Sequence, residues 1–291
     1  MSSISWILEE TTLPKLGFLG QGNHGYISLV RTPDGLLMAK KTSYRKYSEN
    51  LEKESRILNH FNSIHFNIVR PTSPIVYDET MPLNVKVSSV YMELAPHGSL
   101  LDMIAKAGEI LPEKVAGYCI LQVLEGLRDL HRDGYVHCDL KAENILIFPS
   151  YTHGELCDLK LADFSLAKEP NGPNPVEPLF EGEPEYLAPE AVGPRGMISS
   201  AVDIWSLGVM VMQMLGAIIT EGDRRTYFTG RLSPMVKDFL RRCIVHNPVA
   251  RATAEELMSH PFVRQSIGVP PLEMLPVPSC LSNGGVQGRF F

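Results

Sequence analysis

The segment that decides the fold runs from Val136 to Leu146 and reads VHCDLKAENIL. Its polar residues Asp139, Lys141 and Asn144 stand among apolar residues of the kind that proteins bury. Burying polar or charged groups is costly unless they bind a ligand or pair with one another. The segment therefore predicts a functional site in which these three side chains act together.

A further acid lies nineteen residues beyond Asn144, in Leu161–Ser165, which reads LADFS. Asp163 is again surrounded by apolar neighbours. The amide oxygen of Asn144 and the carboxylate of Asp163 are hard ligands suited to Mg²⁺ carrying a triphosphate. Phosphoryl transfer needs mainly positioning, charge neutralisation and an acceptor for a hydroxyl proton. The two segments together indicate phosphoryl-transfer chemistry.

A glycine-rich stretch lies upstream: Gly20–Ile27 reads GQGNHGYI. Glycines let the backbone approach phosphate oxygens closely and present N–H groups to them. On its own, an ordinary glycine-rich hairpin explains the pattern about equally well. No helix is expected directly after it, so the stretch lacks the strand–turn–helix context of a dinucleotide-binding fold.

The next expected strand, Gly35–Lys41, ends in two lysines. Neighbouring residues of a strand face opposite sides, so Ala39 and Lys41 share one face. A nucleotide cleft needs a small residue beside the adenine and a lysine two residues further on. We therefore expect Lys41, rather than Lys40, to reach the α- and β-phosphates.

A carboxylate is needed to hold that lysine, and the expected helix Ser48–His60 offers Glu52 and Glu54. Glu54 lies four residues before Leu58, so it shares a face with an inward apolar residue. Glu52 is expected to face solvent. Glu54 is the predicted partner of Lys41.

The chain divides into a strand-rich first third, up to about Tyr91, and a helix-rich remainder. Apolar residues at helical spacing predict later helices over Glu113–His131, Ala201–Leu215, Ser233–Val245 and Thr253–His260. This division predicts an α+β fold of two lobes with a cleft between them. The junction is expected near Glu93–Gly98.

These motifs, in this order, resemble those of the eukaryotic protein kinases, over Leu16 to Val263. Met92–Ala95 (MELA) resembles the kinase hinge, Tyr186–Glu190 (YLAPE) the end of the activation segment and Asp203–Gly208 (DIWSLG) the central helix of the large lobe. Arg251 resembles the partner of Glu190. The resemblance implies a bilobal kinase fold, with a small antiparallel sheet lobe carrying one key helix and a larger helical lobe.

The resemblance also implies ATP and Mg²⁺ as cofactors. Asp139 would orient the attacking hydroxyl, Lys141 would stabilise the transferring phosphoryl group, and Asn144 and Asp163 would bind the metal. Met92 would be the gatekeeper, with backbone groups of Glu93 and Ala95 presented to adenine. The residues expected around the nucleotide are Leu19, Gly20, Gln21, Gly22, Asn23, His24, Gly25, Ile27, Ala39, Lys41, Glu54, Met92, Glu93, Ala95 and Leu146.

The expected kinase domain spans residues 16–263, with a small lobe over about 16–92, a hinge over about 93–98 and a large lobe over about 99–263. Residues 1–15 are expected to form an N-terminal extension and residues 264–291 a tail rich in proline and glycine. Asp139–Asn144 has the serine/threonine form of the motif. His65–Val69 and the ending His260–Phe262 resemble the MAP kinase kinase kinases, particularly plant ones, which implies a protein substrate such as a MAP kinase kinase.

Cys138 stands where many kinases have an arginine that pairs with a phosphate on the activation segment, and a thiol cannot form that pair. Phe164–Glu190 has only Ser165 and Tyr186 as hydroxyl residues. It is acidic instead, through Glu169, Glu177, Glu181, Glu183 and Glu185. These acids fit either a phosphate-mimicking role or an ordinary solvated surface. Activity is therefore expected without activation-loop phosphorylation.

Three further departures keep a second function class open, a pseudokinase scaffold that acts by docking partners. Ser165 replaces the glycine of the metal-binding triplet. Glu183 replaces a threonine that in the family contacts Asp139 and Lys141, which brings like charges together. Gly216–Leu232 is shorter than the family's substrate-docking region. An active kinase is favoured by five retained residues: Lys41, Glu54, Asp139, Asn144 and Asp163.

The net charge of −6 over 291 residues argues against nucleic acid or an anionic membrane as the main partner. The five cysteines show no C-x-x-C spacing, which indicates free thiols in a reducing compartment. No secretory signal opens the sequence, and no apolar run is long enough to span a bilayer. A cytoplasmic location, extending to the nucleus, is expected.

Overall fold

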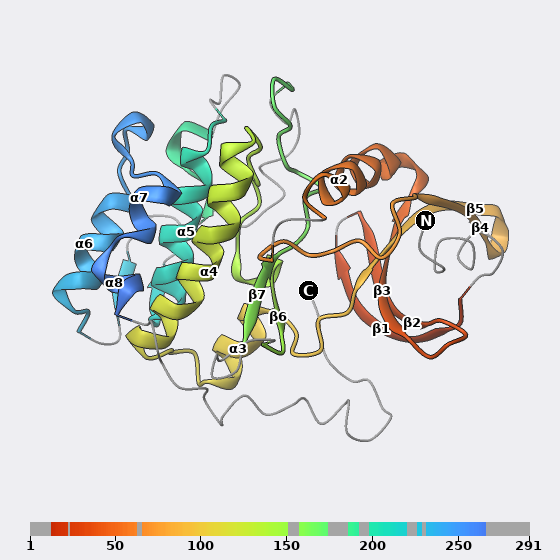
Figure 1. Cartoon of the computed structure of the whole chain (residues 1–291), viewed down its shortest axis with the longest axis horizontal. Coiled ribbons are helices and arrows are strands. Elements are labelled where there is room, and N and C mark those ends of the chain that lie inside the picture. The colour runs from red at the N-terminus through yellow and green to blue at the C-terminus, as the bar shows by residue number, and fades with distance from the viewer. Residues whose placement is uncertain are drawn as a thin grey trace.

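The computed structural model describes residues 13–22, 24–62, 66–150, 157–173, 186–191, 198–219, 226–228 and 231–265. Figure 1 shows two lobes side by side, one built on an antiparallel sheet with helix α2 against it and the other built of helices. The predicted bilobal α+β architecture is confirmed. The expected N-terminal extension and proline-rich tail lie almost wholly outside the described residues.

The small-lobe sheet has five antiparallel strands in the order β1-β2-β3-β5-β4. Its strands are β1 (Lys15–Gly22), β2 (Gly25–Arg31), β3 (Leu37–Tyr44), β4 (Tyr77–Met81) and β5 (Val85–Glu93). Helix α2 (Ser48–Phe61) follows β3 and buries Leu51, Ile57 and Leu58, as its apolar periodicity predicts. Strand β3 begins later than expected because Gly35, with a φ of 94°, donates its N–H to Thr32 in a turn.

The helices of the large lobe are α3 (Leu100–Lys106), α4 (Glu113–Arg132), α5 (Ala201–Met214), α6 (Pro234–Cys243), α7 (Ala254–Met258) and α8 (Pro261–Arg264). Short 3-10 turns cover Arg45–Tyr47, Pro82–Asn84, Ala142–Asn144, Pro189–Ala191 and Pro248–Ala250. The Ser233 hydroxyl caps α6 by accepting the Val236 N–H, with Pro234 in the first turn. The helix expected over Thr253–His260 is instead the short α7, and His260 caps the next helix, α8.

Two small hairpins complete the large lobe. Strand β6 (Ile145–Phe148) pairs with β7 (Asp158–Leu161). Strand β8 (Ala217–Ile219) pairs with β9 (Thr226–Phe228), and the sequence did not predict this second hairpin. Strand β6 begins directly after Asn144 and β7 ends just before Asp163, and Ile145 lies opposite Leu161. The hairpin therefore brings the two predicted metal ligands to one end of the sheet.

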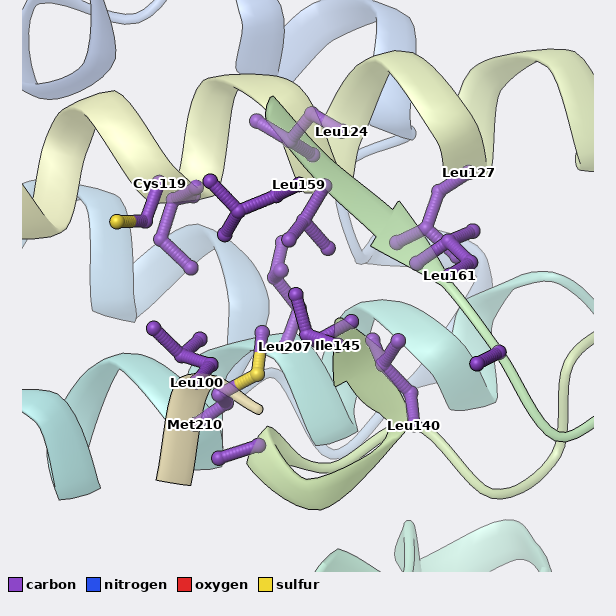
Figure 2. Close-up of a cluster of buried hydrophobic side chains, with 14 of the residues drawn as sticks. Leu100, Cys119, Leu124, Leu127, Leu140, Ile145, Leu159, Leu161, Leu207 and Met210 are labelled. Carbon is purple, nitrogen blue, oxygen red and sulfur yellow. The ribbon is translucent and has the colours of Figure 1, made fainter. Parts of the chain in front are cut away.

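A cluster of buried hydrophobic side chains packs around this hairpin. In Figure 2, Leu124 and Leu127 of α4 lie beside β7, and Leu207 and Met210 of α5 lie on the opposite side of Ile145. Leu140, from the segment Val136–Leu146, points into the same cluster and is 1% exposed. Fully burying one such side chain stabilises the fold by about 1.5–3 kcal/mol. The segment Val136–Leu146 is thus fixed on the core of the large lobe.

Among the residues that the structure describes, no helix is both long enough and apolar enough to cross a bilayer.

Candidate active site

The glycine-rich stretch forms the turn between β1 and β2 over the cleft. Gly22 pairs with Gly25 across this turn, and Asn23 lies outside the described residues. A side chain at Gly25 is excluded, because a Cβ there would lie 1.9 Å from the Thr42 carbonyl oxygen of β3. At Gly22 the equivalent position is open. The stretch therefore leaves room above the cleft for a ligand that contacts the backbone.

His24 holds the glycine-rich turn against the rest of the small lobe, and its expected contact with the nucleotide stays a prediction. Its ring packs edge-on against the ring of Tyr47, with the centroids 4.6 Å apart. Its carbonyl oxygen accepts hydrogen bonds from the Ser43 hydroxyl at 2.8 Å and the Tyr44 N–H at 3.3 Å. The turn is thereby fastened to the end of β3 and to the residue before α2.

Lys41 is the centre of the small-lobe side of the cleft. Its Nζ lies 2.6 Å from Glu54 Oε2 and 2.8 Å from Asp163 Oδ1. Lys40 points to the other face of the sheet and pairs with Glu79 at 2.6 Å. The Glu54 side chain is 1% exposed, whereas its helix neighbour Glu52 is exposed. The structure thus places in the cleft the lysine and the glutamate that strand and helix periodicity select.

These three charges determine one another's protonation. Burial alone would lower the pKa of Lys41, but the carboxylates of Asp163 and Glu54 raise it above its usual range. Burial raises the pKa of Glu54, and Lys41 offsets this only in part. A cation is therefore held in the cleft at physiological pH.

The pocket beneath the glycine-rich turn has a mostly apolar lining, with the Lys41–Glu54–Asp163 ion-pair cluster and, at the hinge, Glu93. Its lining residues are Leu19, Ile27, Ala39, Lys41, Glu54, Val69, Met92, Glu93, Leu94, Ala95, Leu146, Ala162 and Asp163. Ten of them were expected from the sequence; Val69, Leu94 and Ala162 were not. Gly20, Gln21, Gly22, His24 and Gly25 are not among the lining residues and lie on the strands and turn above.

Glu93 at the hinge was expected to act only through its backbone, but its carboxylate also makes contacts of its own. Glu93 Oε1 accepts from Lys160 Nζ of β7 at 2.6 Å and from the Arg70 N–H at 2.8 Å. The Lys160 side chain is 3% exposed, and its Nζ lies over the Phe148 ring at 4.4 Å. This ion pair, in which Lys160 is buried and Glu93 is 23% exposed, joins the hinge directly to the large lobe, and nothing in the local sequence pattern indicated it.

On the large-lobe side, Asn144 organises the catalytic loop. Its Nδ2 donates to the Asp139 backbone oxygen at 2.8 Å and to Asp139 Oδ2 at 2.9 Å. Lys141 Nζ lies 3.4 Å from the same carboxylate oxygen. Burial raises the pKa of Asp139, and the Lys141 ammonium and the Asn144 amide limit that rise. The three residues that the sequence singles out are in mutual contact.

The loop that carries Asp139 is anchored by Asp203 of α5, whose side chain is 1% exposed. Asp203 Oδ2 accepts from the His137 N–H and from His131 Nε2, each at 2.8 Å, and Oδ1 accepts from the Cys138 N–H at 2.9 Å. Cys138 has a φ of 66°, which is strained for a residue with a side chain, and the bond to Asp203 helps to hold it there. Sequence reasoning noted Asp203 only within a helix motif, although an acid in the apolar run DIWSLG was a usable signal.

His137 braces the loop. Its Nε2 lies 3.0 Å from the Ala162 carbonyl oxygen, and its Nδ1 accepts the Asp139 N–H at 3.3 Å. The ring also packs against Phe164, with centroids 4.9 Å apart. His131 has a structural role through its contact with Asp203.

Asp163 closes the site from the end of β7. Its φ is 60°, and its Oδ1 accepts hydrogen bonds from Lys41 Nζ at 2.8 Å, from the Ser165 hydroxyl at 2.6 Å and from the Ser165 N–H at 3.2 Å. Burial opposes the charged form, but Lys41 and these bonds lower the pKa of Asp163 well below its usual range. Asp163 is therefore a permanent carboxylate.

The donor set fits a magnesium ion. Among the described residues, no group of three or more His, Cys, Asp or Glu side chains could hold a metal ion by itself. One carboxylate and one amide oxygen, from Asp163 and Asn144, match Mg²⁺, which keeps several waters and takes the rest of its ligands from phosphates. The Ala162 N–H donates to the Asn144 carbonyl oxygen at 2.9 Å, which holds these two residues at one place.

Two ion pairs position the activation segment where it is described. Arg56 of α2 contacts Glu169, with Nη2 3.2 Å from Oε2. Arg251 binds Glu190 through two contacts, at 2.6 Å and 3.0 Å, as expected from the sequence. Glu177, Glu181, Glu183 and Glu185 lie outside the described residues, so their expected roles stay predictions.

The two-lobed fold, with the Lys41–Glu54 pair on one side of a cleft and Asp139, Asn144 and Asp163 on the other, defines the protein kinase class. The family model of the protein kinase domain matches residues 13–263. The chain belongs to the protein kinase domain family.

Curated relatives are serine/threonine kinases. The chain is 31% identical over 280 residues to mitogen-activated protein kinase kinase kinase 3 of Arabidopsis thaliana, covering 89% of this chain and 44% of that protein. It is 32% identical over 269 residues to mitogen-activated protein kinase kinase kinase 18 of the same plant, covering 84% of this chain and 75% of that protein. It is 32% identical to the human serine/threonine-protein kinase PAK 4, covering 89% and 44%. The chain thus spans less than half the length of two of these relatives.

Proposed function

We propose that this chain transfers the γ-phosphate of ATP to a serine or threonine hydroxyl of another protein. The observation that carries the proposal is the contact of Lys41 Nζ with both Glu54 and Asp163, at 2.6 Å and 2.8 Å. This contact joins α2, β3 and the metal-binding segment across the cleft. Phe164, the next residue, is fully buried beneath α2, and its N–H faces Glu54 Oε1 at 3.4 Å. The parts contributed by both lobes are therefore assembled together.

In this proposal each side chain has one task. Lys41 binds the α- and β-phosphates, and the apolar lining of the pocket takes the adenine. Asn144 and Asp163 would hold Mg²⁺, which neutralises charge on the phosphates. Asp139 orients the substrate hydroxyl and accepts its proton, a task favoured by a carboxyl whose pKa burial raises toward the working pH. Lys141, beside Asp139, neutralises charge on the transferring group.

The proposal is tested with Mg·ATP and a basic protein substrate, by measuring phosphate incorporation with the wild-type chain and with Asp139→Asn. We expect Asp139→Asn to lower the rate about a hundredfold or more, because positioned proton transfer contributes about 10²–10⁴. The control is Asp133→Asn, whose carboxylate pairs with His60 outside the cleft and is expected to leave the rate unchanged. Thermal stabilisation by ATP without any incorporation would instead support the alternative, a nucleotide-binding pseudokinase scaffold.

We also propose that activity does not require phosphorylation of the activation segment. The two hydroxyl residues of Phe164–Glu190 are buried: Ser165 is 7% exposed and Tyr186 is 8% exposed. Both hydroxyls are engaged in hydrogen bonds, to Asp163 and Gln213 respectively. Helix α2 already contacts the segment through a carboxylate, that of Glu169. A phosphate has neither an accessible acceptor hydroxyl here nor an arginine at Cys138 to bind it.

Phosphatase treatment tests this second proposal. We expect a protein treated with phosphatase, and shown by mass measurement to carry no phosphate, to keep its full initial rate. A rate that falls with dephosphorylation and returns on rephosphorylation of this segment would contradict it.

The names of the plant relatives favour a MAP kinase kinase as the protein substrate. We propose this substrate class together with the cytoplasmic location expected from the sequence. The test is incorporation of phosphate into a catalytically inactive MAP kinase kinase, compared with the same protein after its activation-segment serines and threonines are changed to alanine.

A further inference from the structure

The hydroxyl of Ser165 lies in the site but has no task in the proposed function. Ser165 follows Asp163 and Phe164 at the end of β7, at the position where the kinase family has glycine. The residue is 7% exposed, so its hydroxyl is directed into the protein and not into solvent. It is not among the residues with positive φ, so its backbone conformation does not demand glycine. The serine is therefore accommodated without backbone strain.

The Ser165 hydroxyl is bonded to the predicted metal ligand itself. Its Oγ donates to Asp163 Oδ1 at 2.6 Å, and its N–H donates to the same oxygen at 3.2 Å. A glycine would provide only the longer of these two bonds. Hydrogen bonds to a carboxylate are stronger than those between neutral groups, and the shorter bond is the one that depends on the side chain.

All three donors to Asp163 converge on one carboxylate oxygen. Lys41 Nζ, Ser165 Oγ and the Ser165 N–H all reach Oδ1. Oδ2 receives no hydrogen bond from the residues that the structure describes. The carboxylate is thus fixed in rotation about its side-chain bonds, with one oxygen saturated by donors and the other free to bind a cation.

We propose that Ser165 is a positioning residue for magnesium, which fixes the Asp163 carboxylate so that Oδ2 is available to the metal before the metal arrives. A ligand that is already ordered does not have to lose side-chain freedom on binding, so the ion binds more tightly. This inference rests on one part of the proposed function, the binding of Mg²⁺ together with a nucleotide. It does not depend on transfer of a phosphoryl group.

The experiment is calorimetric titration of Mg²⁺ into the complex of the full chain with ADP, for the wild type, Ser165→Ala, Ser165→Gly and Ser165→Thr. We expect Ser165→Ala and Ser165→Gly to raise the Mg²⁺ concentration for half-saturation about tenfold, because each removes one short charge-assisted bond. Ser165→Thr keeps a hydroxyl and is expected to stay within about twofold of the wild type. ADP affinity without Mg²⁺ is expected to be unchanged in all of them.

The matched control is Ser88→Ala. Ser88 is a fully buried serine of β5 whose hydroxyl donates to Asp78 Oδ1 at 2.7 Å, outside the cleft. It is expected to leave the Mg²⁺ half-saturation unchanged, although it loses a bond of the same kind. If Ser165→Ala is poorly folded, Ser165→Gly, with the family's residue, provides the measurement.

Two results would overturn the inference: equal Mg²⁺ half-saturation for the wild type, Ser165→Ala and Ser165→Gly, or a wild-type chain that binds no Mg²⁺ with ADP. The proposed function fails separately. A chain that shows the tenfold shift but labels no protein supports the role of Ser165 and contradicts the kinase activity.

Discussion

The two sides of the cleft are held by different kinds of contact. On the large-lobe side, buried Asp203 accepts three hydrogen bonds from the catalytic loop and α4, and the hydrophobic cluster of Figure 2 lies beneath. On the small-lobe side, α2 reaches the site through the Lys41–Glu54 pair and reaches the activation segment through a partly exposed ion pair, Arg56–Glu169. Buried networks are rigid, whereas exposed ion pairs contribute little. Asp139, Lys141 and Asn144 therefore lie on the side held by a buried network, whereas α2 is joined to the activation segment only by the more exposed Arg56–Glu169 pair.

The largest effect is expected from breaking the rigid side with Asp203→Ala. Three buried donors lose their acceptor, and each unsatisfied group costs about 1–3 kcal/mol. We expect the free energy of unfolding to fall by about 3 kcal/mol or more, with loss of activity, in denaturant titrations. The control is Asp133→Ala, which removes a carboxylate that pairs with the half-exposed His60 ring and is expected to cost far less. Equal losses of stability would show that the Asp203 network does not anchor the loop.

The next effect is expected from breaking the contact between α2 and the site with Glu54→Gln. Lys41 keeps Asp163 as a partner and the amide keeps an acceptor oxygen, so we expect the loss of stability to stay below about 3–5 kcal/mol, the cost when a buried ion pair loses one partner. The rate is expected to fall about tenfold to a hundredfold because Lys41 is no longer held in one position. Steady-state kinetics and thermal melts separate the two effects. Glu52→Gln, on the exposed face of the same helix, is the control and should leave both quantities unchanged.

A smaller effect is expected at the outer contact of α2. A double-mutant cycle with Arg56→Ala and Glu169→Ala should give a coupling free energy of about 0.2–1 kcal/mol, the range of exposed ion pairs. The side chains are 58% and 35% exposed, which limits the gain from their attraction. The cycle is measured on both stability and rate. A coupling several times larger would mean that this pair, rather than Lys41–Glu54, sets the position of α2.

The smallest effect on activity is expected from Lys40→Met. Lys40 is adjacent to Lys41 on β3, but it pairs with Glu79 on the face away from the cleft. We expect the rate to stay within about twofold of the wild type, while Lys41→Met lowers it severely. Parallel initial-rate measurements check this. Similar losses of rate from both substitutions would show that the face of β3 on which a lysine lies does not determine its role.

Local periodicity was sufficient to predict several parts of the site. Strand alternation selected Lys41 over Lys40, and helical spacing selected Glu54 over Glu52, because each choice depends only on which face a residue occupies. Polar residues in apolar runs identified Asp139, Asn144 and Asp163, because burial without a partner is costly. The fold class followed from the change in pattern near Glu93.

Contacts between distant segments were beyond such reasoning. Val69 lines the pocket, and Lys160 reaches Glu93, only because the packing of the two lobes brings them there. The Arg56–Glu169 pair joins residues 113 positions apart, and no local pattern specifies such a pairing. The packing of the His24 ring on Tyr47 also depends on tertiary structure and was not predicted. Long-range packing decided each of these.

The Lys160–Glu93 pair has a consequence for compounds that would compete with the proposed nucleotide. Because the hinge carboxylate is already bonded to a lysine and to a backbone N–H, an inhibitor that enters there meets peptide groups and not a free charge. Peptide groups are common to all hinges, so they give affinity without discrimination. Selectivity at this pocket is therefore expected to come from other lining side chains, such as Met92 and Val69.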